Sequence, residues 1–330
     1  MNFEIIKILR CPKTGMPLTW EETTRDLGHE ELYEGWLVSE DKQHRYPVRN
    51  GIPRFVPESN YADSFGMQWN HFAKTQLDSH SGHSISADRF WLATGWCPDD
   101  MKGKWILDVG CGSGRFAEVA LNSGAKVVAL DYSSAVDACF ENLRDHQNLY
   151  VVQGDIYSLP FTPNAFDFIY SLGVLQHTPD VAKAFSALPI MLGVNGKLCV
   201  DYYEKSFKSL FLPKYWLRPL TKGIKKNKLF SFLERVVPTL LFVSRAVQRI
   251  PMVGKLLMRA IPVANYDGVL PLSERQLREW ALLDTFDWLS PAYDNPQTKK
   301  SARMYMKQAQ MDQIEVVNAG HLVARGCKSL

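Results

Sequence analysis

Three glycines at alternate positions, Gly110, Gly112 and Gly114, stand where an apolar run gives way to a helix-forming run, in ILDVGCGSGRFAEVAL at residues 106–121. Glycine weakens both strands and helices, so its repeated use here indicates a sharp turn or a close approach of the backbone to another group. In an open α/β sheet, the first turn from strand to helix is where nucleotides bind. The glycine turn therefore predicts a nucleotide-like ligand.

The glycine spacing and two acidic residues narrow the class of ligand. Dinucleotide sites use G-x-G-x-x-G, but here the third glycine comes one place early and Arg115 occupies its slot. Asp131 ends the second expected strand, 23 residues after Asp108, where a carboxylate accepts ribose hydroxyl groups. Asp155 ends the third strand, where it can accept from an adenine amino group while the Ile156 amide donates to the ring. A compact nucleoside cofactor is favoured.

Other interpretations of these residues remain open at this point. The glycines alone can form a tight strand-to-helix junction with no ligand, and Asp131 or Asp155 alone can cap a helix N-terminus. An NAD(P)-dependent oxidoreductase would keep the glycine turn and Asp131 but would leave Asp155 without a role. A catalytically silent protein that retains the cofactor pocket and serves as a scaffold is a third alternative.

The chain around the glycine turn alternates between strands and helices. Expected strands are residues 105–109, 126–130, 149–153, 166–171 and 197–203, and expected helices are 115–123, 135–145 and 181–192. This alternation predicts a doubly wound α/β domain with a parallel, Rossmann-like sheet. Residues 313–317 and 321–325, joined at Asn318-Ala319-Gly320, predict a closing antiparallel hairpin.

Three further parts are expected around the α/β domain that contains this sheet. Residues 1–60 predict a small β-rich N-terminal module, and residues 61–100 a connecting helical arm. The cofactor-binding α/β domain is assigned to 101–204 and 299–330, with a basic and apolar helical insert, a cap or lid, at 205–298. Prolines such as Pro238 are expected to end or kink helices within the insert, and residues 284–294 are expected to form a loop.

Four motifs in order, ILDVGCGSGRF, VVALDYSS, VQGDIYSLPF and FDFIYSLGVLQHTPD, resemble the class I S-adenosylmethionine-dependent methyltransferases over about residues 101–203 and the closing hairpin. The resemblance implies S-adenosylmethionine as cofactor and S-adenosylhomocysteine as product. It implies that Asp108 and the three glycines surround the methionine part, that Asp131 holds the ribose, and that Ser171 lies beside the sulfonium. The expected cofactor site comprises Asp108, Gly110, Cys111, Gly112, Gly114, Asp131, Tyr132, Asp155, Ile156, Ser171 and Gln68.

Methyl transfer to a hydroxyl benefits from a base within hydrogen-bond reach, and His177 on the fourth-strand loop is the candidate catalytic residue. The alternative is that His177 caps the next helix or packs beneath the site. Tyr202, Tyr203 and Tyr293 are candidates for substrate binding, although the first two can equally be ordinary strand residues. The fourth-strand loop lacks the Pro-Pro-Tyr run of nucleic-acid amino methyltransferases, so O-methylation of a sugar or secondary-metabolite hydroxyl is predicted.

The insert concentrates the positive charge of the chain. Residues 204–265 contain thirteen Lys or Arg and two Glu, a local net charge of +11 in a chain whose total is +3. Cations interleaved with bulky apolar residues indicate a surface for anionic lipid, a lid over an anionic or lipid-linked acceptor, or a helical cap with solvated lysines. Peripheral membrane contact is thus predicted through 205–262, and a nucleic-acid partner is disfavoured.

The cysteines and the N-terminal segment point to a reduced, cytoplasmic protein, with an inner-membrane surface as the alternative location. The six cysteines include no C-x-x-C pair, which disfavours disulfides and zinc cages. No apolar run is long enough to cross a bilayer, and no secretory signal is recognised. LRCPKTGMPL resembles a zinc-ribbon-like segment of some bacterial proteins. In metal-binding versions a Cys-Pro-x-Cys motif supplies two thiolates, but here Thr14 stands in place of the second cysteine and leaves Cys11 alone, so no metal is predicted.

Overall fold

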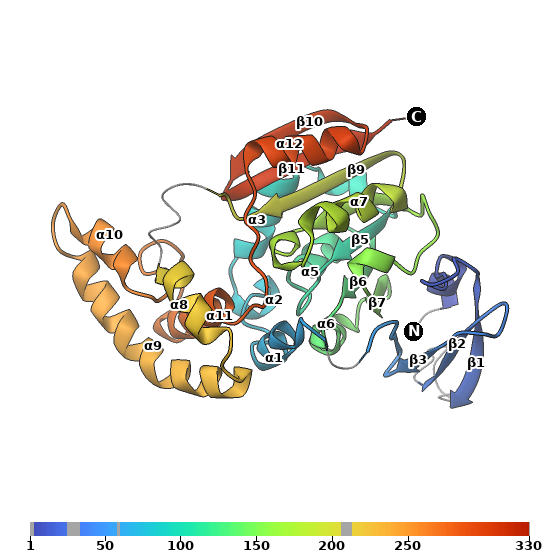
Figure 1. Cartoon of the computed structure of the whole chain (residues 1–330). Helices are drawn as coiled ribbons and strands as arrows, with labels where there is room; N and C mark the ends of the chain where they lie inside the picture. The colour runs from blue at the N-terminus through green and yellow to red at the C-terminus, as the bar shows by residue number, and fades with distance from the viewer. Residues whose placement is uncertain (1–2, 25–33, 58–59, 206–212, 330) are drawn as a thin grey trace.

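A seven-stranded sheet forms the centre of the computed structural model, which describes residues 3–24, 34–57, 60–205 and 213–329 (Figure 1). The strand order is β10-β11-β9-β8-β5-β6-β7. The strands are β5 (Trp105–Val109), β6 (Lys126–Asp131), β7 (Leu149–Gln153), β8 (Phe166–Ser171), β9 (Leu192–Tyr202), β10 (Met311–Ala319) and β11 (His321–Lys328). Strands β5 to β9 pair in parallel, whereas β11 pairs antiparallel with β9 and with β10. The prediction of a doubly wound sheet with a closing hairpin is confirmed.

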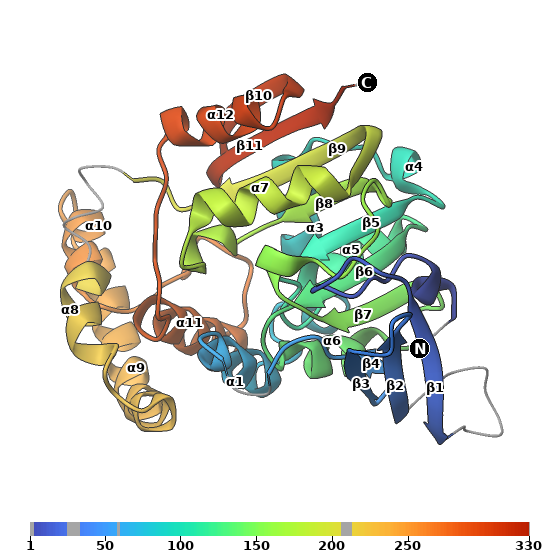
Figure 2. The same ribbon diagram turned by 45° about the vertical axis from the view of Figure 1, so that its right-hand side comes forward.

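Each face of the sheet buries its own apolar core. Leu107 and Val109 of β5 face one core, and Ile106 faces the other, as the twofold repeat of a strand requires. Helices cover both faces of the sheet, as the two views of Figures 1 and 2 show. Those that contribute side chains to the two cores include α5 (Arg115–Asn122), α6 (Ala135–Leu143), α7 (Val181–Met191) and α12 (Lys299–Gln308). The order of the strands reverses at β5, between β6 and β8, so the ligand crevice is expected at the carboxyl end of β5.

The N-terminal module is a four-stranded antiparallel sheet of β1 (Leu18–Thr24), β2 (Glu34–Ser39), β3 (Arg45–Arg49) and β4 (Ile52–Pro53). Its buried side chains Leu37 and Val48 belong to the same apolar core as Leu107, whereas Ile52 belongs to the core on the other face. The Phe55 amide donates to the Gln153 carbonyl over 2.8 Å, which extends the pairing beyond the edge strand β7. The module therefore covers one edge of the main sheet.

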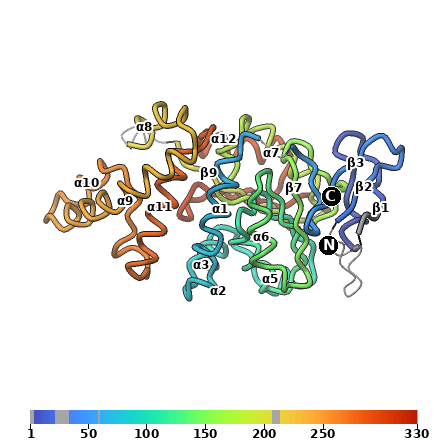
Figure 3. The backbone as a smooth tube through the Cα atoms, turned by 90° about the horizontal axis from the view of Figure 1, so that it is seen from below, coloured from blue at the N-terminus to red at the C-terminus, as the bar shows by residue number. Residues whose placement is uncertain are grey.

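The insert is helical, as the fold prediction has it, and the segment between the N-terminal module and the main sheet is helical as well. The arm contains α1 (Asp63–His71), α2 (Asp78–Ser81), α3 (Ile85–Thr94) and α4 (Pro98–Met101). The insert contains α8 (Pro213–Thr221), α9 (Lys226–Gln248), α10 (Gly254–Leu257) and α11 (Glu274–Leu289), while residues 206–212 lie outside the described part of the chain. Figure 3 shows α9 and α10 at the opposite end of the molecule from β1, β2 and β3.

The insert differs from expectation in two places. Helix α9 does not end at Pro238 but continues through it, because apolar side chains on both sides of the proline, Leu233, Val237 and Leu241, pack against α11. Residues 284–289, expected in a loop, form the last turns of α11. Within the described residues, no helix combines the length and apolar character that crossing a membrane demands.

Candidate functional site

The glycine turn connects β5 to α5 with all three glycines at positive φ, namely +85° for Gly110, +53° for Gly112 and +96° for Gly114. A Cβ atom on Gly110 would lie 2.3 Å from Val174, and one on Gly114 would lie 2.6 Å from Leu143. Gly110 and Gly112 line a cavity of about 1160 Å³, whereas Gly114 packs against α6. Two glycines thus expose backbone to the cavity, and the third is required by helix packing.

We expect Gly110→Ala to destabilise the fold, because the added methyl combines an unfavourable φ with a steric clash against Val174. The cost should be about 3 kcal/mol in the free energy of unfolding, from backbone strain and overpacking together. Chemical denaturation measures it. Gly103→Ala is the matched control, since Gly103 also has a positive φ (+71°) but no neighbouring atom within 4 Å of the added methyl. Equal losses for both variants would contradict the steric argument.

Asp131 ends β6 and presents a fixed carboxylate at the cavity wall. Its Oδ2 accepts from the Gly112 amide over 3.0 Å, and its Oδ1 accepts from the Ser133 amide and hydroxyl over 2.8 and 2.7 Å. Burial raises the pKa of Asp131, and these hydrogen bonds oppose that shift. A carboxylate offers about four acceptor positions, so the Asp131 carboxylate retains capacity for a ligand hydroxyl.

Asp155 occupies a different position from Asp131. It is the N-cap of a 3-10 helix at Ile156–Ser158, where its carboxylate accepts from the Tyr157 amide over 2.9 Å. Its neighbours Gly154 and Ile156 line the cavity, but Asp155 itself does not. Asp155 therefore caps a helix, as the alternative interpretation has it, and a contact between Asp155 and an adenine stays a prediction.

The remaining cofactor candidates divide between the cavity and the core. Cys111 and Tyr132 line the cavity, and the Tyr132 ring lies 4.9 Å from that of Tyr61. Ser171 is fully buried and donates to the Val109 carbonyl over 2.9 Å, away from the cavity wall. Asp108 is also buried behind the wall, and its Oδ2 has no hydrogen-bond partner among the described residues.

Burial raises the pKa of Asp108 to about 8, so the folded protein binds a proton there that the unfolded chain releases near pH 4. This contribution is fully present below the unfolded pKa and is lost as the pH rises toward the folded pKa. We therefore expect Asp108→Asn to gain stability over the natural protein by about 1.4 kcal/mol per pH unit between about pH 5 and pH 8. Parallel urea titrations of both proteins measure it, and a difference independent of pH would contradict it.

Gln68 from α1 supports the fit of a polar ligand to this cavity. Its side chain is fully buried and lines the cavity, yet neither amide atom has a hydrogen-bond partner among the described residues. A buried, unpaired amide costs about 1 to 3 kcal/mol, so a ligand that pairs with it is favoured. The glycine backbone on the cavity wall, the Asp131 carboxylate and the Gln68 amide together suit the backbone contacts, ribose and charged amino-acid end of S-adenosylmethionine.

His177 lies on the same cavity, in a 3-10 helix at Leu175–His177. Its Nδ1 is 3.0 Å from the Tyr293 carbonyl oxygen, which only accepts, so Nδ1 carries the proton in the neutral ring. Nε2 then keeps its lone pair, and this buried atom has no partner among the described residues. The rings of Phe65 and Tyr203 hold the imidazole at centroid distances of 5.2 and 5.4 Å. His177 is thus oriented to accept a proton.

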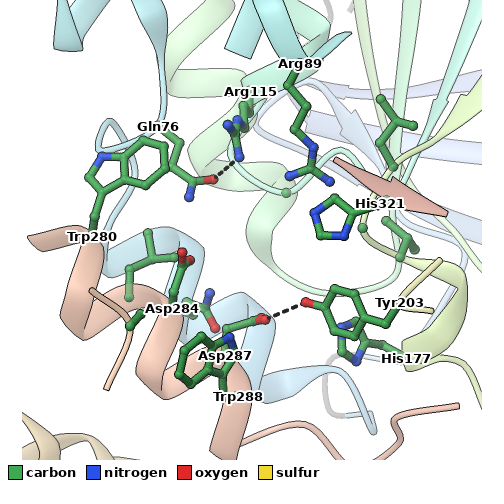
Figure 4. A pocket seen from close by; sticks show the side chains of 18 of the residues that line it. Gln76, Arg89, Arg115, His177, Tyr203, Trp280, Asp284, Asp287, Trp288 and His321 are labelled. Carbon is green, nitrogen blue, oxygen red and sulfur yellow. Dashed lines mark hydrogen bonds between the residues drawn. The ribbon is translucent and has the colours of Figure 1, made fainter. Parts of the chain in front are cut away.

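The three tyrosine candidates take different places. Tyr203 lines the cavity, and its hydroxyl donates to Asp287 Oδ2 over 3.3 Å (Figure 4). Tyr202 is fully buried in the core on the other side of β9 and does not line the cavity. The Tyr293 ring is partly exposed and lies against Tyr61, while its carbonyl orients His177. The structure therefore brings His177 and Tyr203 together, with Tyr293 behind them.

The cavity wall also contains residues from the arm, the start of α5, β11 and α11. Of these, Arg89, Trp280 and His321 were missed by sequence reasoning. Figure 4 shows Arg89, Arg115 and His321 on one side and Trp280, Asp284 and Trp288 of α11 on the other. Burial lowers the pKa of Arg115 to about 9, with Arg89 contributing, and burial raises the pKa of Asp284 to about 6. No local pattern links α11 to the glycine turn, although the acids and rings at residues 284–288 were a usable signal.

Comparisons with known proteins agree with this geometry. Residues 107–200 match a family model described as a methyltransferase domain. The chain is 32% identical over 112 residues to a ubiquinone biosynthesis O-methyltransferase of Coxiella burnetii, a match that covers 33% of this chain and 47% of that protein. It is 31% identical over 121 residues to a demethylmenaquinone methyltransferase of Thermobifida fusca, covering 36% and 51%. The chain spans about half the length of the curated relatives it matches.

Solved structures give weaker likenesses. Human N-acetylserotonin methyltransferase in complex with S-adenosylmethionine is 13% identical, with a TM-score of 0.44 over 83% of this chain and 61% of that chain. An S-adenosylmethionine-dependent methyltransferase of Mesorhizobium loti is 26% identical, with a TM-score of 0.31 over 34% and 51%. On the family match, residues 107–200 form a methyltransferase domain of the class I, S-adenosylmethionine-dependent type, as their motifs predicted.

Proposed function

We propose that the chain transfers a methyl group from S-adenosylmethionine to a hydroxyl of a small-molecule acceptor. The observation that carries the proposal is the shared cavity. The glycine turn and Asp131 line one part of it, and His177, whose buried Nε2 atom keeps its lone pair, lines the same cavity. A base on this cavity favours a hydroxyl acceptor, because it can take the proton that the hydroxyl loses on methylation.

The residues of the chain bind, orient and exclude water. Bound S-adenosylmethionine supplies a methyl group already activated by its sulfonium. In such a transfer the acceptor oxygen would take the methyl group, S-adenosylhomocysteine would be left, and His177 would receive the hydroxyl proton at Nε2. Apolar side chains such as Phe65, Trp280 and Trp288 line the cavity, so the reactants meet largely without water and orientation supplies much of the rate.

We further propose that the acceptor is aromatic and anionic. Arg115 is 9% exposed, and its Nε and Nη1 bind only neutral groups, Ser86 Oγ and Gln76 Oε1, both over 2.9 Å. Arg89, which pairs with Asp201 over 2.9 Å, lines the same cavity. A buried cation without a carboxylate partner favours an anionic ligand group. The names of the two curated relatives, which refer to ubiquinone biosynthesis and to demethylmenaquinone, support a quinone-type acceptor, whereas a sugar hydroxyl stays a prediction from the sequence.

Isothermal titration calorimetry with S-adenosylhomocysteine and with NAD tests the cofactor. Tight binding of NAD together with no response to S-adenosylhomocysteine would replace the proposal by an oxidoreductase. Labelled S-adenosylmethionine, incubated with fractionated small-molecule extract, then separates an enzyme from a silent binding protein. A binding protein leaves every fraction unlabelled.

The charge of the acceptor is tested with two probes of equal shape, benzoate and benzamide, in the presence of S-adenosylhomocysteine. We expect benzoate to bind about tenfold more tightly than benzamide, and Arg115→Gln to remove that preference. Saturation-transfer NMR measures both. If Arg115→Gln instead weakens S-adenosylhomocysteine and leaves the benzoate preference intact, Arg115 serves the cofactor and not the acceptor.

A further inference from the structure

The end of the insert carries a cluster of exposed apolar side chains, here called the apolar tip. It comprises the C-terminal half of α9, the following turn and α10, at the far left of Figure 1. Seven large apolar residues within residues 242–257 are between 42 and 103% exposed. They are Phe242, Val243, Ile250, Met252, Val253, Leu256 and Leu257. Apolar surface gathered in this way indicates an interaction site.

The apolar tip is not needed to complete the core of the insert. Helix α9 places Leu229, Leu233, Val237 and Leu241 on one face, at intervals of four residues, and this face packs against α11. Phe242 lies outside that buried face and is 73% exposed. The apolar tip therefore remains uncovered after the insert has folded.

Cations without acidic partners surround the apolar tip. The sequence from residue 235 to residue 266 contains no Asp or Glu. Arg235, Arg249, Lys255 and Arg259 are exposed, and none of them forms an ion pair with another described residue. Arg245 differs, because it reaches Asp267 and Glu274 further along the chain. This arrangement suits an anionic membrane surface. The apolar side chains can enter the boundary with the acyl chains, and the unpaired cations can contact the charged head groups.

We propose that the apolar tip inserts into the interface of an anionic lipid bilayer and holds the protein there peripherally. A second copy of this chain is a poorer partner, since a symmetric contact would place cations against cations. Met258, Arg259 and Ile261 follow the apolar tip directly and line the cavity, so docking brings the cavity wall next to the bilayer. The proposal stands independently of the methyl-transfer activity, although it suits an acceptor with an apolar tail.

Vesicle flotation of the full chain tests the proposal. Vesicles of phosphatidylcholine are compared with vesicles that also contain about 30% phosphatidylserine, at low and at high salt. We expect binding to the anionic vesicles to be at least about fivefold stronger and to weaken with salt. In the double variant Met252→Asp with Leu256→Asp, binding should fall about tenfold.

The matched control is Ile190→Asp with Val194→Asp, two apolar residues of the α/β domain that are 53 and 54% exposed. It adds the same charge and should bind vesicles within about twofold of the natural protein. Retained binding of S-adenosylhomocysteine, or an unchanged circular dichroism spectrum if that ligand is not bound, shows that each variant is folded. Equal binding by the tip variant and the natural protein overturns the proposal. The proposal is also overturned if light scattering shows that the natural protein is a dimer and that the variant Met252→Asp with Leu256→Asp is a monomer. The partner of the apolar tip would then be a second copy of the chain.

Discussion

Asp131→Ala is expected to weaken S-adenosylhomocysteine binding by about 100-fold, because the cofactor ribose loses its charged hydrogen-bond acceptor. A hydrogen bond to a charged group contributes about 1.5 to 3 kcal/mol, so losing one hydroxyl contact corresponds to roughly that factor. The effect is large because hydrogen bonds from Gly112 and Ser133 hold the Asp131 carboxylate in place at the cavity wall. Isothermal titration calorimetry provides the dissociation constants.

Ser133→Ala serves as the matched control for Asp131. It removes the hydroxyl that donates to Asp131 Oδ1 over 2.7 Å but keeps the carboxylate and the backbone amide bond. We expect a loss of only about threefold in affinity. If Asp131→Ala binds as well as Ser133→Ala, the carboxylate does not hold the ribose, and the cofactor site is misplaced.

His177→Ala is expected to lower the turnover of methyl transfer by about 100-fold or more while leaving S-adenosylhomocysteine affinity within about twofold. The missing group is the Nε2 lone pair that receives the acceptor proton. Single-turnover transfer of labelled methyl to the acceptor found in extract measures the loss. Partial recovery with added imidazole would show that the base itself, and not its packing, is responsible.

Two variants separate a catalytic role for His177 from a structural one. His321→Ala removes another imidazole on the cavity wall and should retain turnover within about fivefold. Arg218→Gln tests the positioning of His177. Arg218 pairs with Asp294 and donates to the Tyr293 carbonyl oxygen over 2.7 Å, and the same oxygen accepts from His177 Nδ1. We expect about a tenfold loss in turnover with unchanged KM. Full turnover in His177→Ala would refute the base and favour the capping interpretation.

Local sequence was sufficient to predict the alternating strands and helices of the α/β domain and the glycine turn between them. Alternating apolar runs and helix patterns predicted the strands β5 to β9, because burial of both sheet faces imposes that alternation. The glycines at 110, 112 and 114 predicted the turn, because only glycine takes those φ values without strain. For residues 284–289 the sequence predicted a loop, because a proline and further acidic residues follow. The segment is helical, because its apolar side chains pack against α9.

By itself, the sequence determined the doubly wound sheet, its glycine turn and the acidic residue at the end of β6, all of which follow from local backbone preference and the periodicity of burial. Only the tertiary structure decided which side chains share the cavity. It placed Tyr203 on the wall and Tyr202 in the core, joined α11 to the arm around Arg115, and fixed the tautomer of His177 through a carbonyl 116 residues away. The physical reason is that these contacts depend on the packing of segments distant in the chain, on which local propensity carries no information.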